Sequence, residues 1–78
     1  MAMTLDQLQK GQRARVVEVR GHDALALRLM EMGLIDGQEI QMIGVAPLGD
    51  PIEYQVLGYR LSLRRSEAQR VEVELCES

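Results

Sequence analysis

Short apolar runs with the two-residue period of β-strands fill most of this sequence, and that period limits the chain to a mainly β fold. Residues 52–56 and 59–63 alternate apolar and polar side chains on either side of Gly58, which predicts a β-hairpin. In this alternation, Tyr54 and Tyr59 both fall on the inward face. The sequence therefore predicts two paired strands with one buried face.

Three further segments have strand character. In "RARVVEVR", Ala14 and Val16 share one face, but the apolar residues then change face at Val17 and Val19. This change predicts a β-bulge or burial on both sides of the strand. The segments "EIQMI" and "VEVEL" complete a set of five strands. Their inward residues are expected to be Ile40, Met42, Val71, Val73 and Leu75.

One stretch, "GHDALALRLMEMGL", changes to the helical period and predicts a single short amphipathic helix. Asp23 suits the N-cap, and Gly33 suits the left-handed position after the last turn, where a residue without Cβ carries no steric cost. Leu34 would then fold back on the last turn, as in a Schellman motif. The apolar face of this helix consists of Leu25, Ala26, Leu29 and Met32.

Two single turns flank the strands. Thr4 is a candidate N-cap with Gln7 at the capping-box position, and Leu5 and Leu8 lie on one side of that turn. Ser66 is expected to cap a second turn in "RSEAQR". Five short strands with one helix after the first are the parts of a small closed β-barrel, and closure would hide the edges of the sheet.

A chain of 78 residues can build only one small hydrophobic core, so we expect residues 1–78 to form a single domain. Cys76 is the only cysteine, which excludes an intramolecular disulfide and favours a reducing cytoplasm. The N-terminal residues do not resemble a signal peptide, and no apolar run is long enough to cross a bilayer. We therefore expect a cytoplasmic protein without direct membrane insertion.

The side chains that catalysis needs are scarce, and we expect no enzyme. His22 is the only histidine, so no Ser-His-Asp or Cys-His group can be assembled without it. His22, Asp23 and Cys76 lack the spacing of a metal site, so neither a catalytic residue nor a metal ligand is assigned. A net charge of −3 and an aromatic content of 3% argue against nucleic-acid binding.

Positive charge is concentrated near the C-terminus, where residues 59–70 carry four arginines against Glu67. A strand face exposed to solvent is the favoured interpretation of this charge. A docking patch for an acidic partner is the alternative.

The segment "APLGDPIEY" contains both prolines of the chain. It fits a type I turn with Pro47 at the second position, Gly49 at the fourth and Leu48 at the tip. Asp50 is expected to be extended because it precedes Pro51, which can open a strand. Two prolines without N–H groups exclude a phosphate-binding loop. A stiff connector and a docking loop both remain open.

Three motifs in order give the chain a strong resemblance to the FeoA family, ferrous iron transport protein A of bacteria. They are R-L-x-E-M-G-L at the end of the helix, A-P-L-G-D-P-x-E-Y at the loop and G-Y-x-L-S-L-R-x-x-E-A over the last hairpin. The resemblance implies a five- to six-stranded SH3-like β-barrel with one short helix inserted after the first strand. It also implies a cytosolic accessory role with the FeoB-type permease, which carries a GTP-hydrolysing domain.

The leading hypothesis is a non-enzymatic protein that binds and regulates this permease from the cytoplasmic face of the membrane. The expected contact residues are Pro47, Leu48, Gly49, Asp50 and Pro51 in the loop and Arg28 and Glu31 on the helix. A carrier or sensor of Fe²⁺ or another divalent ion, with weak metal binding and no resident cofactor, is the alternative. An RNA-binding small barrel is a third, and homo-oligomers are expected from open sheet edges.

Overall fold

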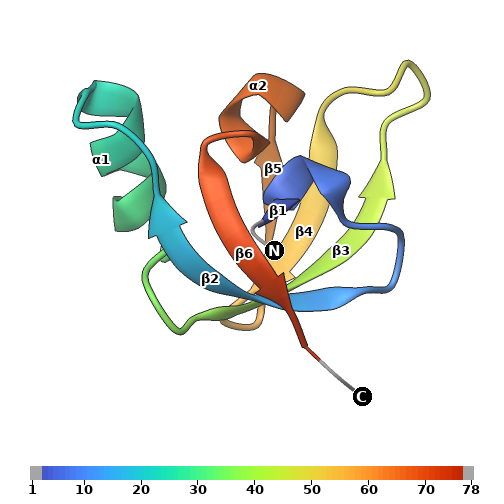
Figure 1. Cartoon of the computed structure of the whole chain (residues 1–78). Helices are drawn as coiled ribbons and strands as arrows, with labels where there is room; N and C mark the ends of the chain where they lie inside the picture. The colour runs from blue at the N-terminus through green and yellow to red at the C-terminus, as the bar shows by residue number, and fades with distance from the viewer. Residues whose placement is uncertain (1–2, 77–78) are drawn as a thin grey trace.

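The computed structural model describes residues 3–76, which form a mainly β structure around one core (Figure 1). Six strands make a single antiparallel sheet with the order β1-β6-β2-β3-β4-β5. The strands are β1 (Met3–Thr4), β2 (Arg13–Val19), β3 (Glu39–Val45), β4 (Ile52–Val56), β5 (Tyr59–Leu63) and β6 (Val71–Leu75). The helical elements are the 3₁₀ turn η1 (Leu5–Gln7) and the α-helices α1 (Ala24–Glu31) and α2 (Arg65–Ala68).

The prediction of a closed barrel was wrong, because the sheet is open between its edge strands β1 and β5. Within residues 3–76, the two-residue strand β1 pairs only with β6, and no backbone ladder joins β1 to β5. The short elements η1 and α2 contact each other and bury Leu5, Leu8 and Ala68 in the core. Helical turns therefore cover the core where a closed barrel would have strands.

Two bulges bend the sheet. The pairing of β2 with β6 shifts register between Val16 and Glu18, which confirms the bulge predicted from the change of apolar face. A second shift between Met42 and Gly44, in the pairing of β3 with β4, was not predicted. Because a bulge adds local twist, these two sites let six short strands wrap around one small core.

The helix α1 has the predicted boundaries. Asp23 caps its start by accepting a hydrogen bond from the Ala26 N–H at 3.2 Å. Gly33 has a φ of +103°, and the N–H of Leu34 donates to the Leu29 carbonyl at 3.3 Å. This bond and the bond from the Gly33 N–H to the Met30 carbonyl form the predicted Schellman motif. Over residues 3–76, no helix has the length and apolar character needed to cross a membrane.

Three side-chain predictions were wrong. Leu75 is 46% exposed because it lies at the end of β6, paired with Ala14 at the rim of the sheet. Tyr59 is 42% exposed because it begins β5, and its hydroxyl donates to the Met32 carbonyl at the end of α1. Ser66 lies inside α2 instead of capping it, since the helix begins at Arg65.

The core is apolar apart from one phenol. Tyr54 is completely buried, and its hydroxyl donates a hydrogen bond to the Leu5 carbonyl at 3.0 Å. Burial raises the pKa of Tyr54, and the nearby Asp6 carboxylate raises it further. The apolar residues buried around it include Val16, Leu29, Leu34, Ile40, Ile52, Val56, Leu63, Val71 and Val73.

We expect Tyr54→Phe to lower the free energy of unfolding by about 1 to 2 kcal/mol, because the buried Leu5 carbonyl would keep only the longer hydrogen bond from the Leu8 N–H, at 3.3 Å. Urea denaturation followed by circular dichroism measures this change. Tyr59→Phe is the matched control, since its hydroxyl bonds a carbonyl at an exposed position, and it should cost clearly less. Equal losses from the two substitutions would contradict a special role for the buried bond.

Candidate partner-binding surface

The loop between β3 and β4 forms the predicted turn. The Gly49 N–H donates to the Ala46 carbonyl at 2.8 Å, which closes a four-residue turn around Pro47 and Leu48. Leu48 is 97% exposed, as expected for the tip. Pro51 follows a cis peptide bond and lies just before β4, which spans the predicted residues 52–56.

The start of α2 holds this loop in place. The Asp50 carboxylate accepts a hydrogen bond from the Arg65 N–H at 2.8 Å, so Asp50 takes the capping role expected of Ser66. The Arg65 guanidinium in turn donates to the Gly49 carbonyl at 3.1 Å. Asp50 and Gly49, both predicted as partner contacts, are therefore bonded within the chain.

The same short helix also contacts α1. Glu67 of α2 accepts hydrogen bonds from the Arg28 guanidinium and, at 2.7 Å, from the Arg64 N–H. Arg28 therefore points toward α2, although it remains exposed. Glu31 is exposed and forms no ion pair with any residue of 3–76.

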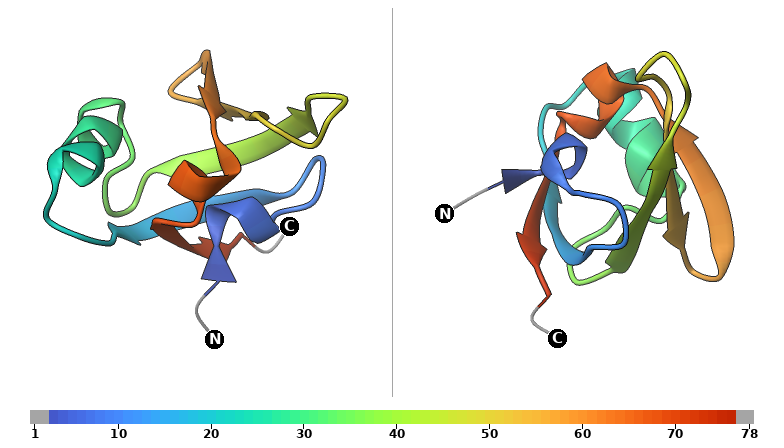
Figure 2. Two further views of the ribbon diagram at one scale, coloured as in Figure 1. Left: turned by 90° about the horizontal axis from the view of Figure 1, so that it is seen from above. Right: turned by 90° about the vertical axis from the view of Figure 1, so that its right-hand side faces the viewer.

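These contacts bring the two predicted surfaces to one end of the molecule, which we call the helical end and define as α1, α2 and the loop 46–51. Figure 1 shows all three at the same end of the sheet, and the view from above in Figure 2 places α2 between α1 and the loop. Sequence reasoning found the outer two elements but missed Arg65 and Glu67 as the residues that join them. In the sequence, the only indication of a role for Arg65 and Glu67 was their position in the charged segment 59–70.

Both ends of α1 are anchored to the sheet. At its start, the Arg70 guanidinium donates to the Arg20 carbonyl at 3.0 Å and to the Asp23 carboxylate at 2.6 Å. Glycine is favoured at position 21, because φ there is +95° and a Cβ would displace the Arg70 guanidinium, which lies 2.1 Å from where that atom would be. At its end, the Tyr59 hydroxyl bonds the Met32 carbonyl. The helix is thus fixed relative to α2 and the loop.

The arginine-rich segment is largely engaged within the chain. Arg60 pairs with Glu53 at 2.8 Å, and Arg70 pairs with Asp23. Arg65 bonds the loop, as described above. Arg64 is exposed and makes no ion pair with another described residue.

The candidate metal ligands do not converge. Val19 pairs with Val71 at one end of the β2–β6 ladder, and Ala14 pairs with Leu75 at the other. His22 follows the first end, whereas Cys76 lies at the second, where its N–H donates to the Arg13 carbonyl. Within residues 3–76, no three histidine, cysteine or acidic side chains gather as a metal site.

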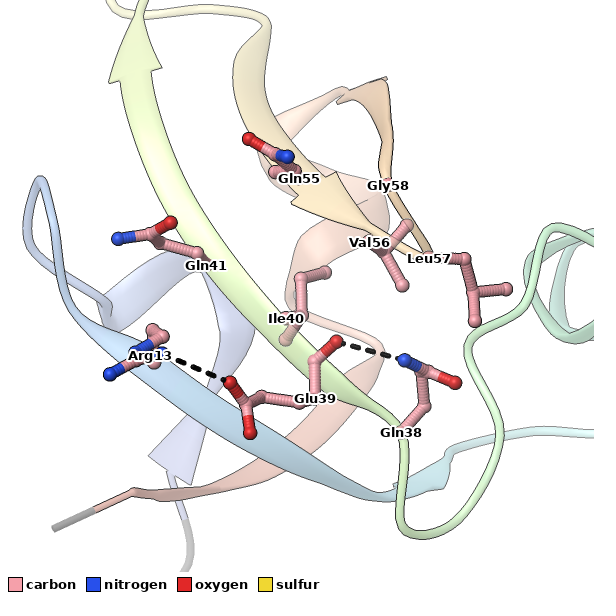
Figure 3. A pocket seen from close by; sticks show the side chains of 9 residues that line it. All are labelled: Arg13, Gln38, Glu39, Ile40, Gln41, Gln55, Val56, Leu57 and Gly58. Carbon is pink, nitrogen blue, oxygen red and sulfur yellow. Dashed lines mark hydrogen bonds and ion pairs between the residues drawn. The ribbon is translucent and has the colours of Figure 1, made fainter. Parts of the chain in front are cut away.

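An open polar groove lies on the outer face of β3 and β4 (Figure 3). Arg13 and Glu39 form an ion pair across it at 3.4 Å, and the Gln38 side chain donates to the Glu39 carbonyl. Leu57 and Gly58 lie at its edge, at the opposite end of β4 from the loop 46–51. The groove therefore lies away from the loop 46–51, although Leu57 at its edge is next to Gly33 at the end of α1.

We expect Asp50→Ala to lower the free energy of unfolding by about 1 kcal/mol, the usual effect of removing a helix cap. Urea denaturation measures the loss. Asp36→Ala is the matched control, since the side chain of this exposed aspartate accepts no hydrogen bond within residues 3–76, and it should change stability by less than about 0.5 kcal/mol. An Asp50 variant as stable as the control would show that α2 does not depend on the loop.

The Asp23 carboxylate should add a pH-dependent contribution to stability. The hydrogen bond from Arg70 lowers the pKa of Asp23, and the bond from the Ala26 N–H lowers it further. The contribution is present above the unfolded pKa of about 3.9 and is lost as the pH falls through the lower folded value. The stability difference between wild type and Asp23→Asn should therefore shrink between pH 5 and pH 2 in urea titrations. A constant difference would contradict the ion pair.

The chain matches known proteins over nearly its whole length. Residues 3–75 match the model of the FeoA domain. The chain is 41% identical over 76 residues to a fusion protein of Fe(2+) transport protein A and Fe(2+) transporter FeoB from Porphyromonas gingivalis. That match covers 97% of this chain but only 9% of the fusion protein.

Solved structures share the fold. A FeoA-like protein from Clostridium acetobutylicum superposes with a TM-score of 0.90 at 34% identity, covering 99% of this chain and 90% of that one. FeoA of Stenotrophomonas maltophilia, crystallised with zinc and described as a prokaryotic SH3 domain protein, gives 0.82 at 41% identity, covering 92% and 89%. These likenesses confirm the SH3-like fold with one short helix after the first long strand. The chain belongs to the FeoA family, the family of ferrous iron transport protein A.

Proposed function

We propose that this protein is a non-enzymatic accessory protein of bacterial ferrous iron uptake that binds and regulates a FeoB-type permease. The observation that carries the proposal is the P. gingivalis relative, in which a segment similar to this whole chain is joined to a FeoB transporter. The joining of such a domain to the transporter in that relative supports an association between the two here. The cytosolic GTPase region of the permease is the proposed contact, which would hold this protein at the inner face of the membrane.

The helical end supplies a suitable surface for that contact. Its loop is fixed by bonds to α2, so little conformational entropy would be lost on binding. Leu48 and Pro47 project from this fixed loop, and both are exposed. Glu31 is exposed on α1 at the same end.

The remaining predicted contacts take a supporting role in this proposal. Asp50 and Gly49 hold the loop on α2, Arg28 holds α1 beside it, and Pro51 leads the loop into β4. In this proposal, binding to the permease is what would change the rate of GTP hydrolysis. Rates of GTP hydrolysis by the permease domain, measured with and without this protein, give the direction of regulation.

A carrier or sensor of divalent metal ions is the second candidate, and the S. maltophilia relative crystallised with zinc favours it. The ion would be cargo for the permease. Calorimetry with Fe²⁺ and Zn²⁺ under anaerobic conditions tests this candidate. Stoichiometric binding that His22→Ala abolishes would support it, and the absence of heat would remove it.

Self-association is a separate expectation. The edge strand β1 pairs only with β6 among the described strands, and an unpaired edge can bind a second chain. Sedimentation equilibrium over a range of protein concentrations measures the oligomeric state. A monomer at every concentration would contradict this expectation without affecting the permease proposal.

We expect Leu48→Asp to weaken binding to the permease GTPase domain about tenfold or more, because a charge replaces an apolar contact. The melting temperature should hardly change, since Leu48 packs against nothing in the fold and is 97% exposed. Binding is measured by calorimetry and stability by thermal denaturation. Leu75→Asp, at the opposite end of the sheet, is the control and should keep its affinity.

Undiminished binding of the Leu48 variant would exclude the loop tip from the contact. A large fall in its melting temperature would instead return the loop to a purely structural role. Failure of the wild-type protein to bind, with or without guanine nucleotide, would contradict the proposed function itself.

A further inference from the structure

The strand β5 is a free edge of the sheet. Its five residues pair with β4 without interruption, from Val56 with Tyr59 to Ile52 with Leu63, and no strand lies on its other side. Both views of Figure 2 show it outermost. The opposite edge, β1, has only two residues. Among the described strands, β5 therefore offers the longer edge for pairing.

The hydrogen-bonding pattern identifies which backbone groups are available. Leu57 and Gly58 both have positive φ, so Val56 and Tyr59 flank a two-residue turn and form a hydrogen-bonded pair. Because antiparallel partners alternate, the N–H and C=O groups of Arg60 and Ser62 then point away from β4. No backbone bond from elsewhere in residues 3–76 reaches them.

Apart from the exposed charge of Arg60, this edge lacks the features that usually prevent strand addition. Residues 59–63 contain no proline and no inward charge, and their pairing has no register shift. The interior pairs β2–β6 and β3–β4, by contrast, are both bulged. A regular edge with unpaired groups is suited to bind an extended segment of another chain.

Charge disfavours a second copy of this chain as that segment. Arg60, Ser62 and Arg64 share one face by the two-residue period, and both arginines are exposed. In any antiparallel pairing that joins the free groups of two β5 edges, Arg60 would lie opposite or diagonal to an arginine of the other copy. Like charges at such positions are destabilising.

Acidic side chains would instead be favoured at the same positions. The only ion pair of Arg60 within the described residues joins it to Glu53, and both side chains are well exposed, so the pair is weak. Arg64 has no ion pair among residues 3–76. Glutamates at alternate positions of an added strand would face these two arginines.

We propose that the β5 edge binds an extended acidic segment of a partner protein by strand addition. The backbone of Arg60 and Ser62 supplies the hydrogen bonds, and Arg60 and Arg64 select acidic side chains. The inference does not depend on the permease proposal, because the partner is defined only by its chemistry.

The test is titration of the ¹⁵N-labelled chain of residues 1–78 with the peptide acetyl-VEVEVE-amide, followed by amide chemical shifts and hydrogen exchange. At about 1 mM peptide, the amides of Arg60 and Ser62 should shift and exchange about tenfold more slowly. The same peptide N-methylated at every residue should bind at least about tenfold more weakly, because it has lost its donors. Acetyl-VKVKVK-amide should not bind.

A pair of variants tests the charge selection. Arg60→Glu should weaken binding of the acidic peptide about tenfold, whereas Arg15→Glu, on the outer face of the interior strand β2, should leave it nearly unchanged. Absent shifts in β5, equal binding of the N-methylated peptide, or slow exchange at Arg60 and Ser62 in the free protein would each overturn the proposal. The titration with the N-methylated peptide uses the wild-type protein, so it tests the proposal even if a variant fails to fold.

Discussion

The hydrogen bond from the buried Tyr54 hydroxyl to the Leu5 carbonyl connects the two parts of the core. Tyr54 belongs to the sheet, whereas Leu5 belongs to the 3₁₀ turn that covers the core where the barrel is open. A domain this small buries only a limited apolar surface on folding, so exposing part of its core to solvent would lower its stability markedly. The hydrogen bond and the burial of Leu5 together keep solvent out of the core, although the sheet is open.

The helical end depends on that arrangement. Once η1 and α2 cover the core, α2 is placed to contact both the loop 46–51 and α1. Asp50 and Arg65 fix the loop, and Glu67 draws Arg28 of α1 toward the same helix. A four-residue helix thus builds one continuous surface from segments far apart in the sequence.

Local patterns predicted the features that neighbouring residues determine. The ends of α1, the bulge after Val16 and the turn beneath Leu48 all follow from residues a few positions apart, and the structure has them. Contacts between distant residues were missed, because a period says nothing about tertiary partners: Asp50 caps a helix 15 residues away, and Arg28 and Glu67 are 39 residues apart. The open sheet was missed for the same reason. Which residues touch a partner stays a prediction.

The most direct test of this account is a map of the contact on the ¹⁵N-labelled protein during titration with the cytosolic GTPase domain of a FeoB-type permease. The account predicts that amide shifts concentrate on the loop 46–51, α1 and α2, which form one end of the molecule. Shifts confined to the polar groove beside Leu57, or no shifts at all with either guanine nucleotide bound, would contradict it.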